Sequence, residues 1–422
     1  MNTGTNYFEL SKAKNFQKII DDLLPVASGD SSISGANLSY LLDALNKMKR
    51  YDDAVSTGKK HFAEVKNNKY ALNSLCFGVY MSRINPHLSD EEVSAETAKT
   101  AGWIIDHYPK EAGSFIWANS LFRAVDFALA HNDLQKAGSL LSLAKADEFN
   151  DEVREIVKDG KTIRLKSDRS KYLKYSFELA KAKGDNSEAL RICELMLEQD
   201  PTDIWNLRRK AQVLEALGKN EESMTIYRQV LQRKTDWFIW HEAAKLALKV
   251  GQDEDAKVYF SRAFNAAGSQ TALFIWHLLV DIALFLEKHG NNDLAKKHLE
   301  YVFHAAIDDN GNKPQEMLKF FFDRKIKPAE NIDLKALLKE LKAYHSENEF
   351  TGEKHSGTVS RMNEGGKTGF INSNGKSYFF LARNFRGKNP KEGIAVTFHL
   401  EKHTNPKTGN EEDQAVGIAI SD

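Results

Sequence analysis

The sequence lacks most of the features that mark metalloproteins, secreted proteins and membrane proteins. Its only two cysteines, Cys76 and Cys193, lie far apart and form no CxxC or Cys/His metal-binding spacing. We therefore expect both to be buried thiols in a reducing compartment. Lys and Arg number 59, as do Asp and Glu, so no net charge draws the chain to nucleic acid or membrane. No apolar run reaches the length of a membrane span and the N-terminus has no secretory pattern, which predicts a cytoplasmic protein without a membrane partner.

Catalytic motifs are also missing. Residues 241–245, HEAAK, begin like the zinc-protease motif but end in lysine, so the second histidine ligand is absent. Residues 366–368, GKT, resemble the end of a phosphate-binding loop without its upstream glycine. His298 and His304 share one predicted helix, where we expect surface residues rather than metal ligands. The sequence therefore predicts a protein that is not an enzyme and has no cofactor, metal or small-molecule substrate.

A period of 33 or 34 residues runs through the middle of the chain. Gly184, Gly218 and Gly251 follow one another at this spacing, and Gly290 comes after a longer unit. Residues of matching size recur at fixed offsets from these glycines, namely Leu173, Leu207, Trp240, Ala211 and Ala244. Weaker units surround residues 51–54 and 132–137. These offsets resemble the tetratricopeptide repeat, in which each glycine turns the chain between two antiparallel helices.

This resemblance implies a solenoid of helical hairpins. We expect at least five hairpins between residues 36 and 310, stacked in a right-handed superhelix. The whole helical domain would cover residues 36–345, after a helical lead-in at residues 1–35. Ala211 and Ala244 would lie where the two helices of a hairpin touch, because small side chains allow close approach.

The resemblance also implies which residues face the concave groove. They are Lys171, Lys174, Glu178, Lys181, Trp205, Arg208, Gln212, Glu215, Phe238, His241, Lys245 and Leu248. A mixed basic and aromatic groove suits a peptide or an acidic protein segment, and a solvated scaffold face is the alternative. Residues 154–183 carry many more basic than acidic side chains, which indicates either a binding patch or only a solvated helix face.

The last part of the chain has a different pattern. After a polar segment at residues 346–355, which we interpret as a linker, residues 356–422 contain short β-type runs separated by Gly, Asn and Lys. Alternate residues in these runs are apolar, at the period of two expected of strands. A small β-domain therefore follows the helical one.

The tail resembles a cold-shock domain, the five-stranded nucleic-acid-binding barrel of the OB class. The matching residues are Gly357, Val359, Asn363, Gly369, Phe370, Ile371, Phe379, Glu392, Gly393, Val396, Thr397, Phe398, Gln414, Ala415 and Val416. Strand parity predicts that Thr368, Phe370, Phe379 and Leu381 point outward. In the family, the outward side chains are aromatic and stack on unpaired bases.

The aromatic face is thinner here than in the family. Arg361 stands at the family's tryptophan, Thr368 at a phenylalanine, and Leu381 and Ala382 at a His-Phe pair. The nucleic-acid-binding residues that the resemblance implies are Phe370, Phe379, Arg361, Lys367, Lys376 and Arg383. A docking or capping barrel that binds no nucleic acid is the alternative.

These features predict a mainly α fold, a tetratricopeptide-like solenoid of helical hairpins followed by a small C-terminal β-barrel that is OB-like or cold-shock-like. The function that fits is a cytoplasmic adaptor. It would hold a protein or peptide partner in the solenoid groove and touch single-stranded RNA or DNA, weakly, with the barrel. A pure protein-interaction scaffold, or a regulatory subunit of an enzyme encoded elsewhere, is the alternative.

Overall fold

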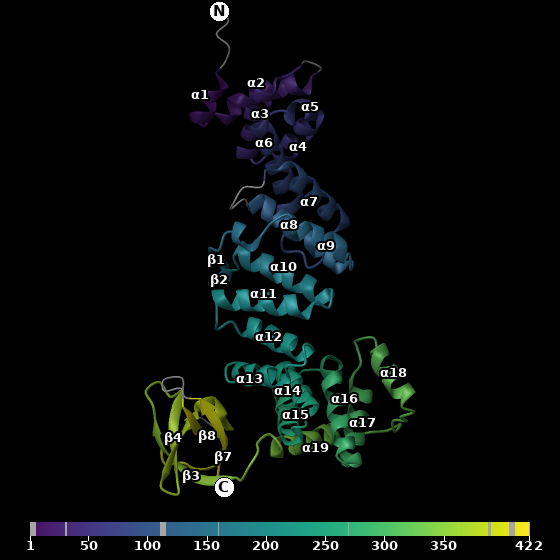
Figure 1. The fold of residues 1–422 in the computed structure, drawn as a ribbon, viewed down its shortest axis with the longest axis vertical. Helices are drawn as coiled ribbons and strands as arrows, with labels where there is room; N and C mark the ends of the chain where they lie inside the picture. Colours follow the sequence, from purple (N-terminus) through teal and green to yellow (C-terminus); the bar gives the residue numbers. More distant parts are fainter. Residues whose placement is uncertain are drawn as a thin grey trace, which may run out of the picture. The chain divides into compact units, whose positions relative to one another are not determined.

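A computed structural model describes residues 6–29, 32–109, 115–158, 160–268, 270–386, 390–404 and 410–421. The chain divides into two compact units, Met1–Asn206 and Leu207–Asp422. Helices and one pair of strands fill the chain up to Glu347, and strands follow from His355 onward (Figure 1). The fold is mainly α, a tetratricopeptide-like helical solenoid followed by a small closed β-barrel, as the sequence predicts.

The N-terminal unit packs its helices around one continuous apolar core that extends from Ile19 to Leu179. Its helices are α1 (Tyr7–Lys12), α2 (Phe16–Ser28), α3 (Gly35–Lys47), α4 (Tyr51–Lys60), α5 (Phe62–Val65), α6 (Lys69–Val79), α7 (Ala95–His107), α8 (Phe115–Ala130), α9 (Leu134–Leu141), α10 (Asp168–Ala182) and α11 (Asn186–Gln199). Short helical turns are η1 (Tyr80–Ile84), η2 (Asn85–His87) and η3 (Ala146–Glu148). Cys76 in α6 and Cys193 in α11 are both buried, as expected.

The second unit continues the helical pairs and then forms the barrel. Helix α12 (Ile204–Ala216) crosses the boundary between the units. The helices that follow are α13 (Asn220–Leu231), α14 (Trp237–Lys249), α15 (Asp253–Ala267), α16 (Ala272–Lys288), α17 (Asn292–Ala305), α18 (Gln315–Asp323) and α19 (Leu334–Glu347).

The repeat glycines lie where the sequence places them, in the turn between the two helices of a hairpin. Gly184, Gly218, Gly251 and Gly290 all have φ between +73° and +78°, a left-handed conformation that glycine adopts without steric cost. After each glycine, the next backbone N–H donates to a carbonyl five residues back, as in the bond from Gln252 to Ala247 (2.9 Å). This bond satisfies a carbonyl at the helix end and closes the turn.

Packing inside the hairpins also follows the prediction. Ala211 and Ala244 are fully buried, and Leu173, Leu207 and Trp240 are buried on the first helices of their pairs. Ser223 in α13 donates to the carbonyl oxygen of Ala211 at 2.7 Å, so the two helices of that hairpin lie in close contact.

One element interrupts the helices and corrects the sequence interpretation. Residues 154–165 do not form part of a charged helix but two antiparallel strands, β1 (Arg154–Lys158) and β2 (Lys161–Leu165). Gly160 lies in their turn with φ +73°, a conformation that glycine adopts without steric cost. The basic residues between 154 and 183 are therefore split between this hairpin and α10.

The barrel consists of β3 (His355–Met362), β4 (Thr368–Ser373), β5 (Lys376–Leu381), β7 (Ala395–Thr404) and β8 (Glu411–Ile420), with a two-residue strand β6 (Phe385–Arg386) beside β8. A short turn, η4 (Ala382–Asn384), follows β5. β3 pairs with β4 and β7, β4 pairs with β5, and β7 pairs with β8, all antiparallel. A parallel contact between β5 and β8 closes the barrel. The core contains Val359, Ile371, Phe380, Val396, Phe398, Ala415 and Ile418.

Candidate nucleic-acid interface and partner groove

Strand parity places the barrel aromatics as the sequence predicts. Gly369, Ile371 and Phe380 are buried, whereas Phe370 and Phe379 are half-buried on the outer face. The two rings lie opposite each other in the ladder between β4 and β5, with centroids 5.7 Å apart and an edge-to-face angle of 68°. They therefore form one continuous aromatic surface across two strands.

Arg361 extends this surface by one more strand. It lies opposite Phe370 in the β3–β4 ladder, and its guanidinium carbon is 4.8 Å from the centroid of the Phe370 ring. The side chain is exposed. Arg361, Phe370 and Phe379 thus form a row across three neighbouring strands, which we call the barrel face. A guanidinium plane can stack on a base much as an aromatic ring does.

The predicted basic residues lie around this row in different ways. Lys367, just before β4, and Lys376, at the start of β5, are exposed at opposite ends of the β4–β5 ladder. Arg383 instead donates to the carbonyl oxygen of Gln232, at the end of α13, over 3.2 Å. Arg383 is therefore in contact with the helical part of its own unit, and no sequence pattern predicts that contact.

A contact between barrel and helices is the main feature that the sequence interpretation missed. Phe350, in the predicted linker, stacks on His399 of β7 with ring centroids 5.3 Å apart. Its ring also lies 5.1 Å from the guanidinium carbon of Arg262 in α15, which lies 4.8 Å from the ring of Trp240. Arg262 donates to the carbonyl oxygen of Glu349 (2.9 Å) and pairs with Glu401 of β7. We call these residues the docking cluster.

The guanidinium charge of Arg262 is buried within the docking cluster. Burial lowers the pKa of Arg262 to about 10, so the guanidinium stays protonated at neutral pH. Its charge is compensated by Glu401, by the carbonyl of Glu349 and by the faces of two aromatic rings. Gly417 of β8 lies against the Phe350 ring, and a Cβ there would be 2.5 Å from its Cε2 atom.

The predicted groove residues of α12 and α14 are brought together around a carboxylate. Arg208 donates two hydrogen bonds to Glu242, from Nε at 2.8 Å and from Nη2 at 2.5 Å. Gln212 and Tyr227 donate to the same carboxylate over 2.9 and 3.2 Å. The guanidinium of Arg208 also lies 4.8 Å from the ring of Phe238. The Glu242 side chain therefore orders this part of the groove, and its hydrogen bond raises the pKa of Arg208.

A second carboxylate orders the next part. Asp281 of α16 lies 2.7 Å from Nε2 of His241 and 3.7 Å from Nζ of Lys245. His241 stacks against Trp237, whose ring meets Phe274 of α16 edge to face at 5.8 Å. Phe274 is 63% exposed, which leaves an aromatic surface open on this side. Trp237 and Phe274 were not among the predicted groove residues.

The remaining groove residues belong to the N-terminal unit. Lys171 pairs with Asp168 at 2.9 Å, and its Nζ lies 5.9 Å from the Phe122 ring of α8. Lys174 is exposed, with Nζ 5.7 Å from the Tyr175 ring, and Lys181 is half-buried. Trp205, at the start of α12, is 43% exposed. The binding roles of the groove and barrel residues stay predictions.

One histidine prediction is wrong. His298 of α17 is not at the surface but fully buried, because α17 packs against α16 and α19 and the Phe264 ring of α15 lies 6.2 Å from its imidazole. Its Nε2 lies 2.9 Å from Nε2 of the buried His345, and its Nδ1 lies 2.8 Å from the carbonyl oxygen of Leu294. His304 lies nearer the surface and contacts the carbonyl oxygen of Ala329 at 2.9 Å.

No cluster of three or more His, Cys, Asp or Glu side chains is placed to hold a metal ion in the part of the chain that the structure describes. Across the same residues, no helix combines the length and the apolar character needed to span a membrane.

Solved structures of low similarity match large parts of this chain. A tetratricopeptide repeat protein from Parabacteroides merdae matches 64% of this chain and 94% of its own, with 12% identity and a TM-score of 0.29. BtubC from P. vanneervenii matches 57% of this chain and 94% of its own, with 15% identity and a TM-score of 0.40. A human IFIT1 dimer with PPP-AAAA matches 81% and 76%, with 13% identity and a TM-score of 0.39.

No protein-family profile matches the sequence, and no curated protein matches it. With every one of these TM-scores below 0.5, the structural matches carry no argument about function. The chain is a tetratricopeptide-like helical solenoid that ends in a five-stranded barrel. Its function has to be argued from its own geometry.

Proposed function

We propose that this protein is a non-catalytic cytoplasmic adaptor whose barrel binds single-stranded RNA or DNA and whose solenoid groove binds a protein partner. The observation that carries the nucleic-acid part is the row formed by Arg361, Phe370 and Phe379 across three strands. Rings and guanidinium planes in such a row offer consecutive stacking positions for unpaired bases, each contributing roughly 1–3 kcal/mol.

The strand order supports assignment of the barrel to the OB class. Numbered along the barrel, its main strands pair in the order 1-2-3-5-4-1, and the closing contact between the third and fifth strands is parallel. OB barrels bind oligonucleotides on the face of their second and third strands. Here these strands are β4 and β5, which carry Phe370 and Phe379.

Charge around the barrel face suits a weak and sequence-tolerant interaction. Lys367 and Lys376 lie at opposite ends of the β4–β5 ladder, where phosphates of a strand that crosses the face would pass. Acidic residues at the start of β8 work against this attraction, although Asp413 is paired with Lys402 at 2.8 Å. Stacking therefore contributes more than charge to the proposed binding.

The groove supports the partner-binding part of the proposal. Arg208 and His241 are held in place by Glu242 and Asp281, so the groove wall is ordered before any ligand arrives. The exposed ring of Phe274 beside Trp237 offers an apolar anchor for a peptide side chain.

A capping role for the barrel is the second candidate, and the docking cluster favours it. Phe350 and Arg262 hold the barrel against α14 and α15 through buried contacts, as expected of a structural cap. A cap needs no exposed aromatic row, however, and the barrel face has one. The two candidates therefore differ in whether this row binds anything.

The two candidate functions predict a different dependence of oligonucleotide affinity on salt and on whether the oligonucleotide is single- or double-stranded. We expect a labelled single-stranded oligonucleotide to bind the full-length protein more tightly than a duplex of equal length, because paired bases cannot stack on the face. Lys367→Glu should make the affinity less dependent on salt, because fewer counterions are released on binding. Fluorescence anisotropy at two salt concentrations measures both effects. Equal affinity for duplex and single strand, with an unchanged salt slope, would favour the capping role.

A further inference from the structure

The N-terminal unit contains a cavity whose lining includes one predicted groove residue, Lys171. It has a volume of about 440 Å³ and lies between α8, α10 and the two ends of the β1–β2 hairpin. Phe115, Phe122 and Tyr175 supply aromatic walls, and Lys166 and Lys171 lie beside them. A cavity of this size and lining can accept a large apolar side chain together with part of its backbone.

The cavity walls are held in place without a ligand. The Phe122 and Tyr175 rings stack with centroids 5.4 Å apart, and the Tyr175 hydroxyl donates to Asp126 over 2.7 Å. Burial, and then the charge of Asp126, raise the pKa of Tyr175, so the phenol remains protonated. Arg123 is buried and donates to the carbonyl oxygens of His87 (2.8 Å) and Leu88. These bonds fix the segment after η2 at the cavity edge.

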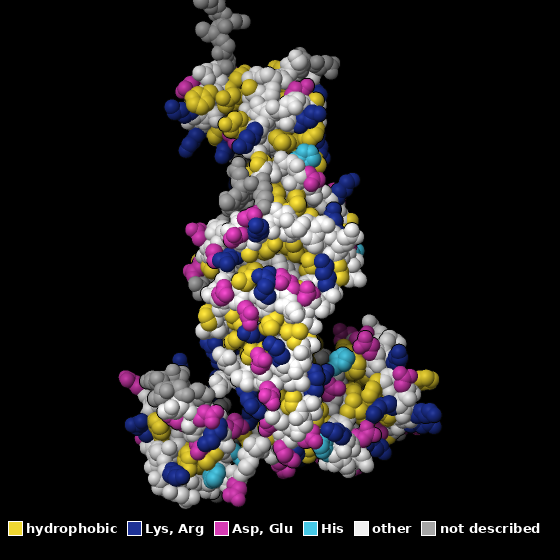
Figure 2. All heavy atoms as spheres, viewed as in Figure 1, with side chains coloured by type: hydrophobic (Ala, Val, Ile, Leu, Met, Phe, Trp, Pro, Cys, Tyr) yellow, Lys and Arg dark blue, Asp and Glu magenta, His cyan; other side chains and the backbone are white. Residues whose placement is uncertain are grey.

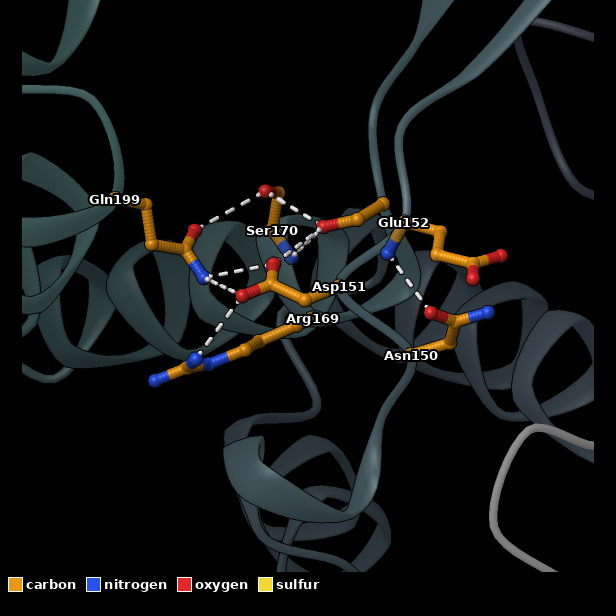
Figure 3. A network of polar contacts seen from close by, with 7 residues as sticks. Asn150, Asp151, Glu152, Arg169, Ser170 and Gln199 are labelled. Carbon is orange, nitrogen blue, oxygen red and sulfur yellow. Dashed lines mark hydrogen bonds and ion pairs between the residues drawn. The ribbon is translucent and has the colours of Figure 1, made fainter.

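The hairpin is fastened to the same helices by the polar network drawn in Figure 3. Asp151, just before β1, accepts hydrogen bonds from Arg169 (3.1 Å) and Gln199 (3.0 Å). The hydroxyl of Ser167 also donates to Asp151 over 3.2 Å. Both ends of the hairpin are thereby tied to α10 and α11. The first residue of β1 and the last residue of β2 therefore have a fixed position beside the cavity.

Exposed apolar side chains lie along the hairpin and at the cavity beside its base. Val153 and Val157 are 51% and 75% exposed, and Leu88, Phe115 and Leu165, which line the cavity, are exposed as well. Figure 2 shows hydrophobic side chains at the surface between charged ones over α8–α10. Within the described residues, β1 and β2 pair only with each other, so each has one edge without a neighbouring strand. An open edge next to exposed apolar side chains is a template for an added strand.

We propose that the hairpin and the cavity at its base form a docking site for an extended, acidic segment of a partner protein. The segment adds as a strand to a hairpin edge and places one aromatic or large aliphatic side chain in the cavity. We expect the segment to be acidic because basic residues outnumber acidic ones in the sequence of the hairpin and α10. The acidic residues there are Glu155, Asp159, Asp168 and Glu178. The basic residues are Arg154, Lys158, Lys161, Arg164, Lys166, Arg169, Lys171, Lys174, Lys181 and Lys183.

A peptide fits this site better than nucleic acid does. Asp126, Asp168 and Glu152 line the cavity, so their carboxylates exclude phosphate and acidic side chains alike, and only the uncharged side chain of the segment enters it. The acidic residues of the segment lie outside the cavity. Nucleic acid would gain nothing from an open strand edge, whereas a peptide backbone can form hydrogen bonds along it. The site is independent of the barrel and does not rest on nucleic-acid binding.

The test selects peptides on the full-length protein from a random dodecapeptide library displayed on phage. The most enriched peptide is then labelled, and its affinity is measured by fluorescence anisotropy. We expect enrichment of peptides with several Asp or Glu residues and one Phe, Tyr, Leu or Val. Leu165→Glu should weaken binding at least about tenfold, because it puts a charge into the cavity lining. Leu143→Glu, at another exposed leucine (44% exposed), is the matched control and should not change the affinity.

Backbone N-methylation at alternate residues of the selected peptide tests strand addition separately. We expect it to weaken binding by about tenfold or more, since the methyl groups remove the donors that would pair with the edge. No enrichment, enrichment of basic peptides, or equal binding by Leu165→Glu would overturn the proposal. Tolerance of N-methylation would also overturn it. Displacement of the peptide by a single-stranded RNA dodecamer would assign the site to nucleic acid instead.

Discussion

The side chain of Arg262 contacts both the helices and the barrel of the second unit. Its guanidinium lies between the rings of Trp240 and Phe350 and meets Glu401 from the barrel. Removing one partner of a buried charge leaves that charge uncompensated, which costs more than the pair itself contributes. These contacts join the barrel to α14, α15 and the segment before β3.

Gly417→Ala should release the barrel from this contact. The new methyl group would overlap the Phe350 ring, and such overpacking costs roughly 1–3 kcal/mol. Limited proteolysis between residues 348 and 354 measures the release, and we expect faster cleavage in the variant. Gly365→Ala is the matched control, since Gly365 also has a positive φ (+85°) but no atom within 4 Å of the added Cβ. Equal cleavage of both variants would show that Phe350 does not hold the barrel.

The buried histidines have defined protonation states. His298 must donate from Nδ1, because a carbonyl oxygen can only accept, and its Nε2 therefore accepts from Nε2 of His345. His345 in turn accepts from the hydroxyl of Ser261 at 3.0 Å. Both imidazoles are neutral in this chain of hydrogen bonds. Burial lowers the pKa of His298 from 6.5 to about 4, and burial followed by the nearby His298 lowers that of His345.

This pair should make stability depend on pH in a defined window. Below about pH 6.5 the unfolded chain binds protons that the folded chain does not, so stability falls as the pH drops toward 4. Above pH 6.5 the pair has no effect on the pH dependence. His298 alone accounts for a loss of roughly 3 kcal/mol across the window. Chemical denaturation at several pH values measures this slope, which should become shallower in the His298→Leu/His345→Leu variant. An equally steep slope would exclude the pair as its cause.

At the scale of elements, the inter-helix turn explains which repeats the sequence revealed. The four repeats with a clear signal have glycine at the left-handed position. The two weak units have Lys49 (φ +59°) and Asn132 (φ +55°) there instead, and both make the same closing hydrogen bonds. The turn is the same in these six repeats, but two of the six lack the glycine that identifies it in the sequence. The same turn also follows α1 at Lys14 (φ +56°) and α18 at Lys325 (φ +55°).

Substitutions at the left-handed position of these turns should change the stability in opposite directions at Gly251 and at Lys49. Gly251→Ala should destabilise the protein by roughly 1–2 kcal/mol, because an L-residue in this conformation brings its Cβ close to the backbone. Lys49→Gly should have no such cost and should gain up to about 1 kcal/mol. Thermal unfolding of both variants measures the effects. A stabilised Gly251→Ala variant would contradict the proposed role of the turn.

The β1–β2 hairpin shows where element prediction failed and why. Its strands contain many Lys and Arg, and a charged segment between two helical repeats was interpreted as helix. The Asp159-Gly160 pair and the alternation of Ile163 and Leu165 with Thr162 and Arg164 were the contrary signal. Each strand has only five residues, and a run that short is not enough for a period of two to identify it.

At the scale of the whole chain, the sequence predicted the components but not the contacts between them. The switch to a period of two at the barrel, and the outward direction of Phe370 and Phe379, follow from strand geometry alone. The contacts of Phe350 with Arg262 and of Arg383 with Gln232 join residues that are 88 and 151 positions apart. No local pattern encodes pairs at that distance. The carboxylates Glu242 and Asp281, which order the groove, were missed for the same reason.

The most direct test of the account is the affinity of full-length Phe370→Ala/Phe379→Ala for a labelled single-stranded oligonucleotide. Both rings lie on the outer face and outside the barrel core, so the variant should remain folded. Phe322→Ala, which removes an exposed ring from α18 (82% exposed), is the matched control. We predict that the double variant binds more weakly by roughly 2–5 kcal/mol, while the control binds like the original protein. Equal affinity of all three proteins would contradict nucleic-acid binding by the barrel face.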